Sequence, residues 1–79
     1  MLVTLTLIKE KQEKSFDVQV PDSQPILETL KILQDNMRMF AQVDRIDTVR
    51  DKRTGRKIDV HSTYQQEKIY SGAELVIPE

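Results

Sequence analysis

The sequence predicts an α+β fold in which one amphipathic helix packs across a mixed sheet of four to five strands. Three observations support this prediction. Apolar residues alternate with polar ones in the first 20 residues, change to helical spacing over the next 20, and return to strand-like spacing in the last 40. Because domains usually contain about 50 to 250 residues, we expect residues 1–79 to form a single domain.

The first 20 residues predict an antiparallel hairpin. Val3, Leu5 and Leu7 alternate with Thr4 and Thr6, a period of two that is typical of a strand with one buried face. The next residues, KEKQEKS, contain no apolar side chain, and alternation then returns in the segment FDVQV at residues 16–20. Two alternating segments joined by a short polar connection are typical of paired strands.

A helix is predicted after this hairpin. Pro21 ends the second strand, because proline cannot donate to a strand ladder. Asp22 or Ser23 is a candidate N-cap, and Pro25 is compatible with the first helical turn. The apolar face that follows consists of Ile26, Leu27, Leu30, Leu33 and Met37. Met37, Met39 and Phe40 lie together near the end of this segment, where we expect them to cover the edge of the core or, if exposed, to form a contact surface.

The remaining residues predict a second hairpin and a closing strand. The apolar positions around the turn RTGR are Ile46, Val49, Ile58 and Val60. Since Ile46 and Val49 are three residues apart, we expect a bulge or a short strand there. Tyr64 and Ile69 are predicted to be buried in the connection HSTYQQEKIYSG, where Gly72 suits a turn with positive φ. The last strand is predicted at residues 74–77, with Leu75 beside Leu7 at the centre of the sheet.

Composition excludes several function classes. The formal net charge of −1 argues against bulk attraction to nucleic acid or to an anionic membrane. The absence of cysteine excludes disulfides, thiolate metal sites and cysteine nucleophiles. The opening apolar run is too short to span a bilayer and its charges follow it, so neither a signal peptide nor direct membrane insertion is predicted. A cytoplasmic location is the resulting expectation.

No catalytic, metal or cofactor site is predicted, so we expect the chain not to be an enzyme. His61 is the only histidine, and no serine, aspartate or second histidine is spaced with it as a catalytic set; a polar surface position is expected. The aspartates in this half of the chain alternate with arginines, which favours surface ion pairs over a calcium loop. They are Asp44, Asp47, Asp51 and Asp59.

The strongest local signal is a cluster of basic side chains around the second turn. Its members are Arg45, Arg50, Lys52, Arg53, Arg56 and Lys57, which give residues 45–57 a net charge of about +4. The cluster predicts either a docking site for an acidic partner or a charged hairpin that discourages stray strand pairing. It contains no aromatic residue for base stacking. Val76 on the last strand is predicted to be an outward-facing apolar contact on the sheet surface.

These residues resemble the ubiquitin-like superfamily, whose fold is the β-grasp. The resemblance rests on the first hairpin, on VPDSQPILETLKILQDN, and on the closing pattern TYQQEKIYSGAELVI. Within the superfamily, the length, the VPDSQPI helix start and the SGAELVI ending are similar to the YukD and EsaB proteins of type VII (WXG100) secretion systems. The resemblance implies a cytosolic adaptor or regulatory component whose protein partner is a cytosolic domain of the membrane secretion machinery.

Other proteins of the same fold suggest two alternative functions. The small ubiquitin-like subunits of diiron monooxygenases imply a non-catalytic accessory subunit of a multicomponent enzyme. Sulfur carriers and conjugated modifiers of the same fold end in a diglycine tail, because only an unhindered terminal glycine carboxylate can be adenylated. The sequence here runs into Pro78 and Glu79 instead, so we expect neither conjugation nor sulfur transfer.

Overall fold

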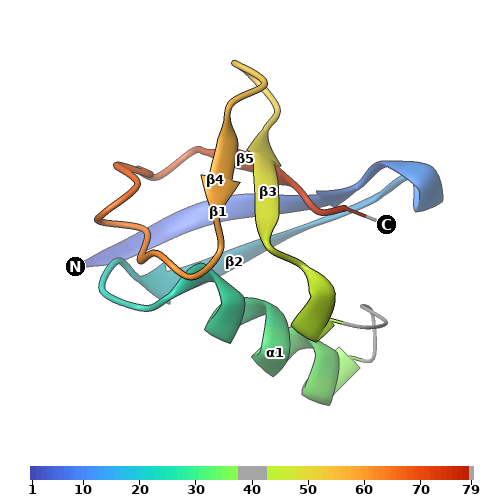
Figure 1. Ribbon diagram of the computed structural model, residues 1–79, viewed down its shortest axis with the longest axis horizontal. Helices are drawn as coiled ribbons and strands as arrows, with labels where there is room; N and C mark the ends of the chain where they lie inside the picture. Colours follow the sequence, from blue (N-terminus) through green and yellow to red (C-terminus); the bar gives the residue numbers. More distant parts are fainter. Residues whose placement is uncertain (38–42, 79) are drawn as a thin grey trace.

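The computed structural model describes residues 1–37 and 43–78 and shows one helix lying across one face of a five-stranded sheet (Figure 1). The sheet order is β2-β1-β5-β3-β4, with β1 and β5 parallel and the other neighbours antiparallel. The elements, with η marking short 3-10 helices, are β1 (Leu2–Lys9), η1 (Glu10–Gln12), β2 (Lys14–Pro21), α1 (Ile26–Met37), η2 (Val43–Arg45), β3 (Thr48–Asp51), β4 (Lys57–Asp59) and β5 (Glu74–Val76).

The centre of the sheet agrees with the prediction. Leu7 of β1 lies opposite Leu75 of β5, and both side chains are fully buried. Val3 and Leu5 bury the same face of β1, as a period of two requires. The predicted irregularity near Ile46 is a short strand, because β3 begins only at Thr48.

The start of the helix differs from the prediction. Because α1 begins at Ile26, Asp22 and Ser23 lie too far upstream to cap it. Two N–H groups of the first turn, which have no acceptor within the helix, donate instead to main-chain carbonyls of a distant segment. Ile26 donates to Ser62 over 3.1 Å and Leu27 donates to Val60 over 2.8 Å. The helix start therefore depends on a segment more than 30 residues away, a partner that no local capping pattern reveals. The predicted cluster of Met37, Met39 and Phe40 lies outside the described side chains.

The connection between β4 and β5 is anchored by Tyr64. Its side chain is fully buried, as predicted. The Tyr64 hydroxyl donates to Thr29 Oγ1 over 2.8 Å, and the Thr29 hydroxyl donates to Gln24 Oε1 over 2.8 Å. This chain of hydrogen bonds satisfies polar groups of the connection, of α1 and of the loop before it inside the core.

Gly72 has φ +93°, which confirms the predicted positive-φ turn. Apart from the two neighbouring residues, no atom of the described residues lies within 4 Å of a Cβ built at this position, so a side chain here has a conformational cost but no clash. We expect Gly72→Ala to lower the free energy of unfolding by about 1 to 2 kcal/mol, and Gly72→Asn to lower it by less, because asparagine tolerates left-handed backbone better. Urea unfolding measures both variants. Equal losses for alanine and asparagine would contradict this explanation.

Candidate functional site

The structure distributes the six predicted basic side chains among three places. The turn between β3 and β4 contains Lys52, Arg53 and Arg56. In Figure 1 this turn is at the top of the molecule and α1 is at the bottom. Arg50 and Lys57 face each other across the two strands. Arg45 ends η2, at the other end of β3 from the turn. Only the three turn residues therefore form a compact group.

Glutamates from distant parts of the sequence offset much of this positive charge. Arg50 pairs with Glu10, with 2.7 Å between Nη2 and Oε1. Lys52 approaches Glu74, and Arg56 approaches Glu67, at 3.9 Å and 3.6 Å. Counting these three glutamates with the six cations and two aspartates of residues 45–57 leaves a net charge of about +1. The strongly basic segment is therefore a mixed-charge surface in the folded protein.

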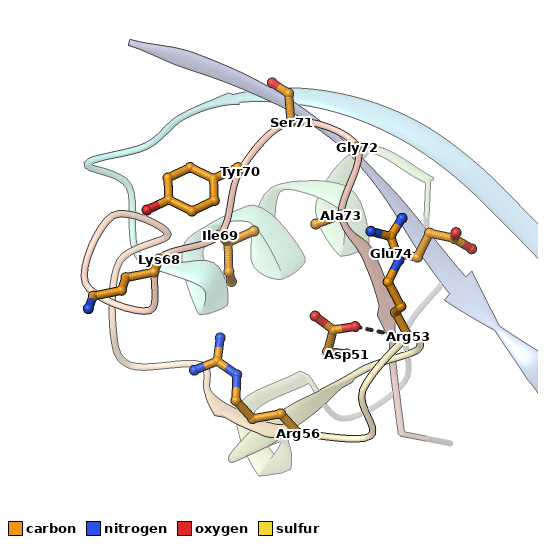
Figure 2. Close-up of a pocket in the computed structure, with 10 residues that line it drawn as sticks. All are labelled: Asp51, Arg53, Arg56, Lys68, Ile69, Tyr70, Ser71, Gly72, Ala73 and Glu74. Atoms are coloured by element: carbon orange, nitrogen blue, oxygen red, sulfur yellow. Dashed lines mark hydrogen bonds between the residues drawn. The ribbon is translucent and has the colours of Figure 1, made fainter.

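A groove of about 220 Å³ lies between the β3–β4 turn and the segment 68–74. Figure 2 shows Asp51, Arg53 and Arg56 on one wall, with Lys68 and Tyr70 on the other. The Asp51 carboxylate is committed to the turn, since it accepts hydrogen bonds from the main-chain N–H groups of Arg53 and Thr54. It therefore fixes the turn that forms this wall of the groove.

Arg56 is fixed in this groove. Its Nη2 donates to the Glu67 carbonyl over 2.8 Å, so its guanidinium bridges the two walls. Within residues 1–37 and 43–78, no ion pair joins the side chain of Arg53 or Lys68. Tyr70 is 72% exposed, so this groove presents two cations without an ion pair and an aromatic ring to solvent.

On the outer sheet face, Val76 lies outside the core cluster, as predicted, but its side chain is mostly covered. Its register partners are Ile8 of β1 and Arg50 of β3, so it lies in a row across the sheet. However, Val76 is only 7% exposed. Because β5 lies between β1 and β3, the ion pair between Arg50 and Glu10 crosses the strand that carries Val76. Val76 nevertheless lines a groove of about 280 Å³ on this face, together with Glu10 and Arg50.

The remaining candidate residues are His61 and the aspartates of this half of the chain. His61 is an exposed side chain whose Nε2 lies 3.8 Å from Asp47 Oδ1. Within the described residues, no group of three or more histidine, aspartate or glutamate side chains is placed to hold a metal ion. No helix of this part of the chain is long and apolar enough to cross a membrane.

Sequence patterns did not identify several residues of the groove. Lys68 and Tyr70 lie in a connection that was predicted only from its buried positions, and Glu67 and Glu74 have no spacing that relates them to the turn. One local signal is present in the structure: Lys68 adopts φ +57°, which is uncommon for a residue other than glycine. Non-glycine residues with such backbone occur often at turns and functional sites.

Comparisons with known proteins identify the fold. No protein-family model matches the sequence, and no curated protein matches it. Among solved structures, the C-terminal ubiquitin-like domain of mouse tubulin-specific chaperone e is 19% identical with a TM-score of 0.72, covering 96% of this chain and 84% of that one.

Two further structures agree with it. A designed protein based on ubiquitin is 16% identical with a TM-score of 0.73, covering 98% of this chain and 87% of the other. The ubiquitin-like domain of Plasmodium falciparum Dsk2 is 15% identical with a TM-score of 0.68, covering 99% of this chain and 100% of the other. At these identities the likeness defines the architecture: this chain has the ubiquitin-like fold, a β-grasp of one helix on a five-stranded mixed sheet.

Proposed function

We propose that this chain is a ubiquitin-like adaptor that acts by binding a protein partner, and that it carries out no catalysis. The observation that carries this proposal is the groove between the β3–β4 turn and the segment 68–74. It combines cationic side chains from two segments, Arg53 and Lys68, with the exposed ring of Tyr70. Such a surface is suited to a partner segment that presents a carboxylate beside an apolar side chain.

The adaptor is proposed to belong to a bacterial type VII (WXG100) secretion system. This assignment rests on the resemblance to the YukD and EsaB proteins in the VPDSQPI helix start and the SGAELVI segment. The partner would be a cytosolic domain of the membrane secretion machinery, and the adaptor would be cytoplasmic or peripheral to that complex. An adaptor of this kind forms no covalent adducts, and its binding involves no nucleic acid.

Affinity capture of the tagged protein from its native cells, followed by mass spectrometry, tests the assignment. Enrichment of membrane secretion subunits is the expected result. Enrichment of soluble oxygenase subunits would overturn it in favour of an accessory role in a multicomponent enzyme. A ladder of higher-mass conjugates of the tagged chain would overturn the adaptor mechanism itself.

The groove is tested by reversing two of its charges. We expect the double substitution Arg53→Glu with Arg56→Glu to keep the fold and to weaken partner capture about tenfold or more, because it replaces attraction to an acidic segment by repulsion. Arg53→Glu alone removes no side-chain hydrogen bond of the described structure, so it separates the charge effect from the loss of the contact between Arg56 and Glu67.

A matched control reverses two charges elsewhere. Lys14 and Lys31 are exposed and do not line this groove, so Lys14→Glu with Lys31→Glu imposes the same change in net charge at another surface. Capture that is lost equally in both double variants would point to net charge. Capture that is unchanged in a folded Arg53→Glu, Arg56→Glu protein would remove the groove as the docking site.

A further inference from the structure

Two ion pairs beside the groove that contains Arg53 are loosely held. Arg56 Nη1 lies 3.6 Å from Glu67 Oε1, and Lys52 Nζ lies 3.9 Å from Glu74 Oε2. Both distances exceed the 2.7 to 2.9 Å or so that is typical of a charge-assisted hydrogen bond. The side chains of Arg56 and Lys52 are also 49% and 53% exposed. Because exposed ion pairs shift an equilibrium by about fivefold at most, a competing carboxylate can replace either glutamate.

The two glutamate side chains are not needed to hold this surface in place. Arg56 Nη2 donates to the main-chain carbonyl of Glu67 over 2.8 Å. The Lys52 main-chain N–H donates to the main-chain carbonyl of Glu74 over 3.0 Å. Substitution of either glutamate by glutamine keeps these carbonyls and removes only the charge of the side chain. The carboxylates therefore neutralise cations whose segments the backbone already positions.

Main-chain N–H groups of the groove are largely committed to the fold. Four of them in the segment 68–74 donate to carbonyls within the chain, namely those of Lys68, Ile69, Gly72 and Ala73. Binding of an anion in this groove therefore depends on cationic side chains. Figure 2 shows the Arg56 side chain extending from the β3–β4 turn toward Ile69, where a partner segment in the groove can reach it.

The charge of the groove depends on whether the two glutamates stay in place. The charged groups are four cations, Lys52, Arg53, Arg56 and Lys68, and three carboxylates, Asp51, Glu67 and Glu74. Their net charge of about +1 is balanced by a single partner carboxylate. If Glu67 and Glu74 turn away, the charge that faces a partner rises to about +3 and is balanced by a run of three carboxylates.

We propose that the partner segment carries a run of carboxylates, and that this run displaces the side chains of Glu67 and Glu74 from Arg56 and Lys52. The inference rests on the proposed docking role of the groove and specifies its partner as a strongly acidic segment. The two glutamates act as internal competitors. A segment with one carboxylate reaches only the cations without an ion pair, whereas a run of carboxylates gains enough contacts to offset the displacement.

Two synthetic peptides with blocked ends test this inference. They have the same length and one leucine each, but one has three glutamates beside the leucine and the other has one glutamate and two glutamines. Fluorescence anisotropy of the dye-labelled peptides is measured below about 0.1 M salt, because charges more than about 10 Å apart are screened at that concentration. We expect the unaltered protein to bind the three-glutamate peptide about tenfold more tightly than the other.

Removal of the internal competitors should increase affinity. We expect Glu67→Gln and Glu74→Gln each to bind the three-glutamate peptide about three- to fivefold more tightly than the unaltered protein, and the double variant about tenfold or more. The matched control is Asp35→Asn, because Asp35 is exposed on α1 and does not line this groove. It makes the same change in net charge at another surface, and its affinity should stay within about twofold.

The gain in Glu67→Gln should require Arg56. In a protein that carries Arg56→Gln, we expect Glu67→Gln to leave the peptide affinity unchanged, because the cation that the glutamate neutralises is absent. A purely stabilising role for Glu67 gives a different result. Glu67→Gln would then be less stable in urea unfolding and would gain no more affinity than Asp35→Asn.

Several results would overturn the inference while leaving the docking role of the groove intact. They are equal affinity for the two peptides, no gain in Glu67→Gln and Glu74→Gln beyond that in Asp35→Asn, and an equal gain with and without Arg56. Absence of peptide binding would do the same if capture of the native partner still depended on Arg53 and Arg56.

Two further outcomes are distinct from these. Tighter binding of a single-stranded oligonucleotide with the same number of charges would overturn the inference, because the occupant would then be a nucleic acid. Undiminished capture of the native partner by folded Arg53→Glu, Arg56→Glu protein would remove the proposed docking role, and the inference with it.

Discussion

We expect the substitution Tyr64→Ala to lower the free energy of unfolding by about 3 to 5 kcal/mol, the range measured for removal of large buried aromatic side chains. The Tyr64 ring is fully buried among the core side chains beneath α1. Its removal also leaves Thr29 Oγ1 without the hydrogen bond from Tyr64. A domain of this size has a total stability of about 4 to 12 kcal/mol, so the variant could lose most of it.

Chemical denaturation monitored by circular dichroism measures this loss, with Tyr64→Phe as the control. Phenylalanine keeps the ring and removes only the hydroxyl, and Thr29 still donates to Gln24. A loss of about 1 kcal/mol is therefore expected for Tyr64→Phe. If Tyr64→Ala unfolded within 1 kcal/mol of the unaltered protein, Tyr64 would not have the central packing role assigned to it.

The second large effect is a loss of stability at alkaline pH. Burial raises the pKa of Tyr64 from 10.0 to about 12, and the hydrogen bond with Thr29 opposes part of this rise. The folded protein therefore favours the neutral phenol more strongly than the unfolded chain does. The neutral Tyr64 phenol therefore contributes to the free energy of unfolding. This contribution is fully present below pH 10 and is lost as the pH rises from 10 to about 12. Its size is about 2 to 3 kcal/mol.

Urea unfolding at a series of pH values between 9 and about 12 tests this linkage. We expect the alkaline loss to become smaller by about 2 to 3 kcal/mol in Tyr64→Phe, which has no phenol to ionise in the core. Tyr70 is the matched control, because it is 72% exposed, and Tyr70→Phe should keep the full loss. Parallel pH profiles for the unaltered protein and Tyr64→Phe would show that another group dominates alkaline unfolding.

Strand and helix spacing predicted most of the architecture. Alternation in β1 and β2, the apolar face of α1 and the buried Tyr64 all agree with the structure, because burial selects apolar side chains with the period of each element. The prediction that Asp22 or Ser23 caps the helix was wrong, because it used only neighbouring residues. A capping side chain is encoded within a few residues, whereas the carbonyls of Val60 and Ser62 reach α1 only after the chain has folded back.

The candidate sites were predicted less completely than the fold. The turn predicted at RTGR does lie between β3 and β4, but the sequence could not show that Glu74 approaches Lys52 or that Glu67 approaches Arg56. Val76 was predicted to face outward, but the sequence could not show that its side chain would be only 7% exposed beside the ion pair of Arg50 and Glu10. Opposite charges that are distant in sequence leave no periodic signal.

The sequence by itself therefore determined the ubiquitin-like arrangement of strands and helix, including the central position of the strands that carry Leu7 and Leu75, since hydrophobic spacing and turn residues are local properties of the chain. Only the tertiary structure decided the surfaces. It brought the glutamates to the basic turn and placed Lys68 and Tyr70 across a groove from Arg53. Charge balance depends on which distant segments become neighbours, and local spacing does not encode that.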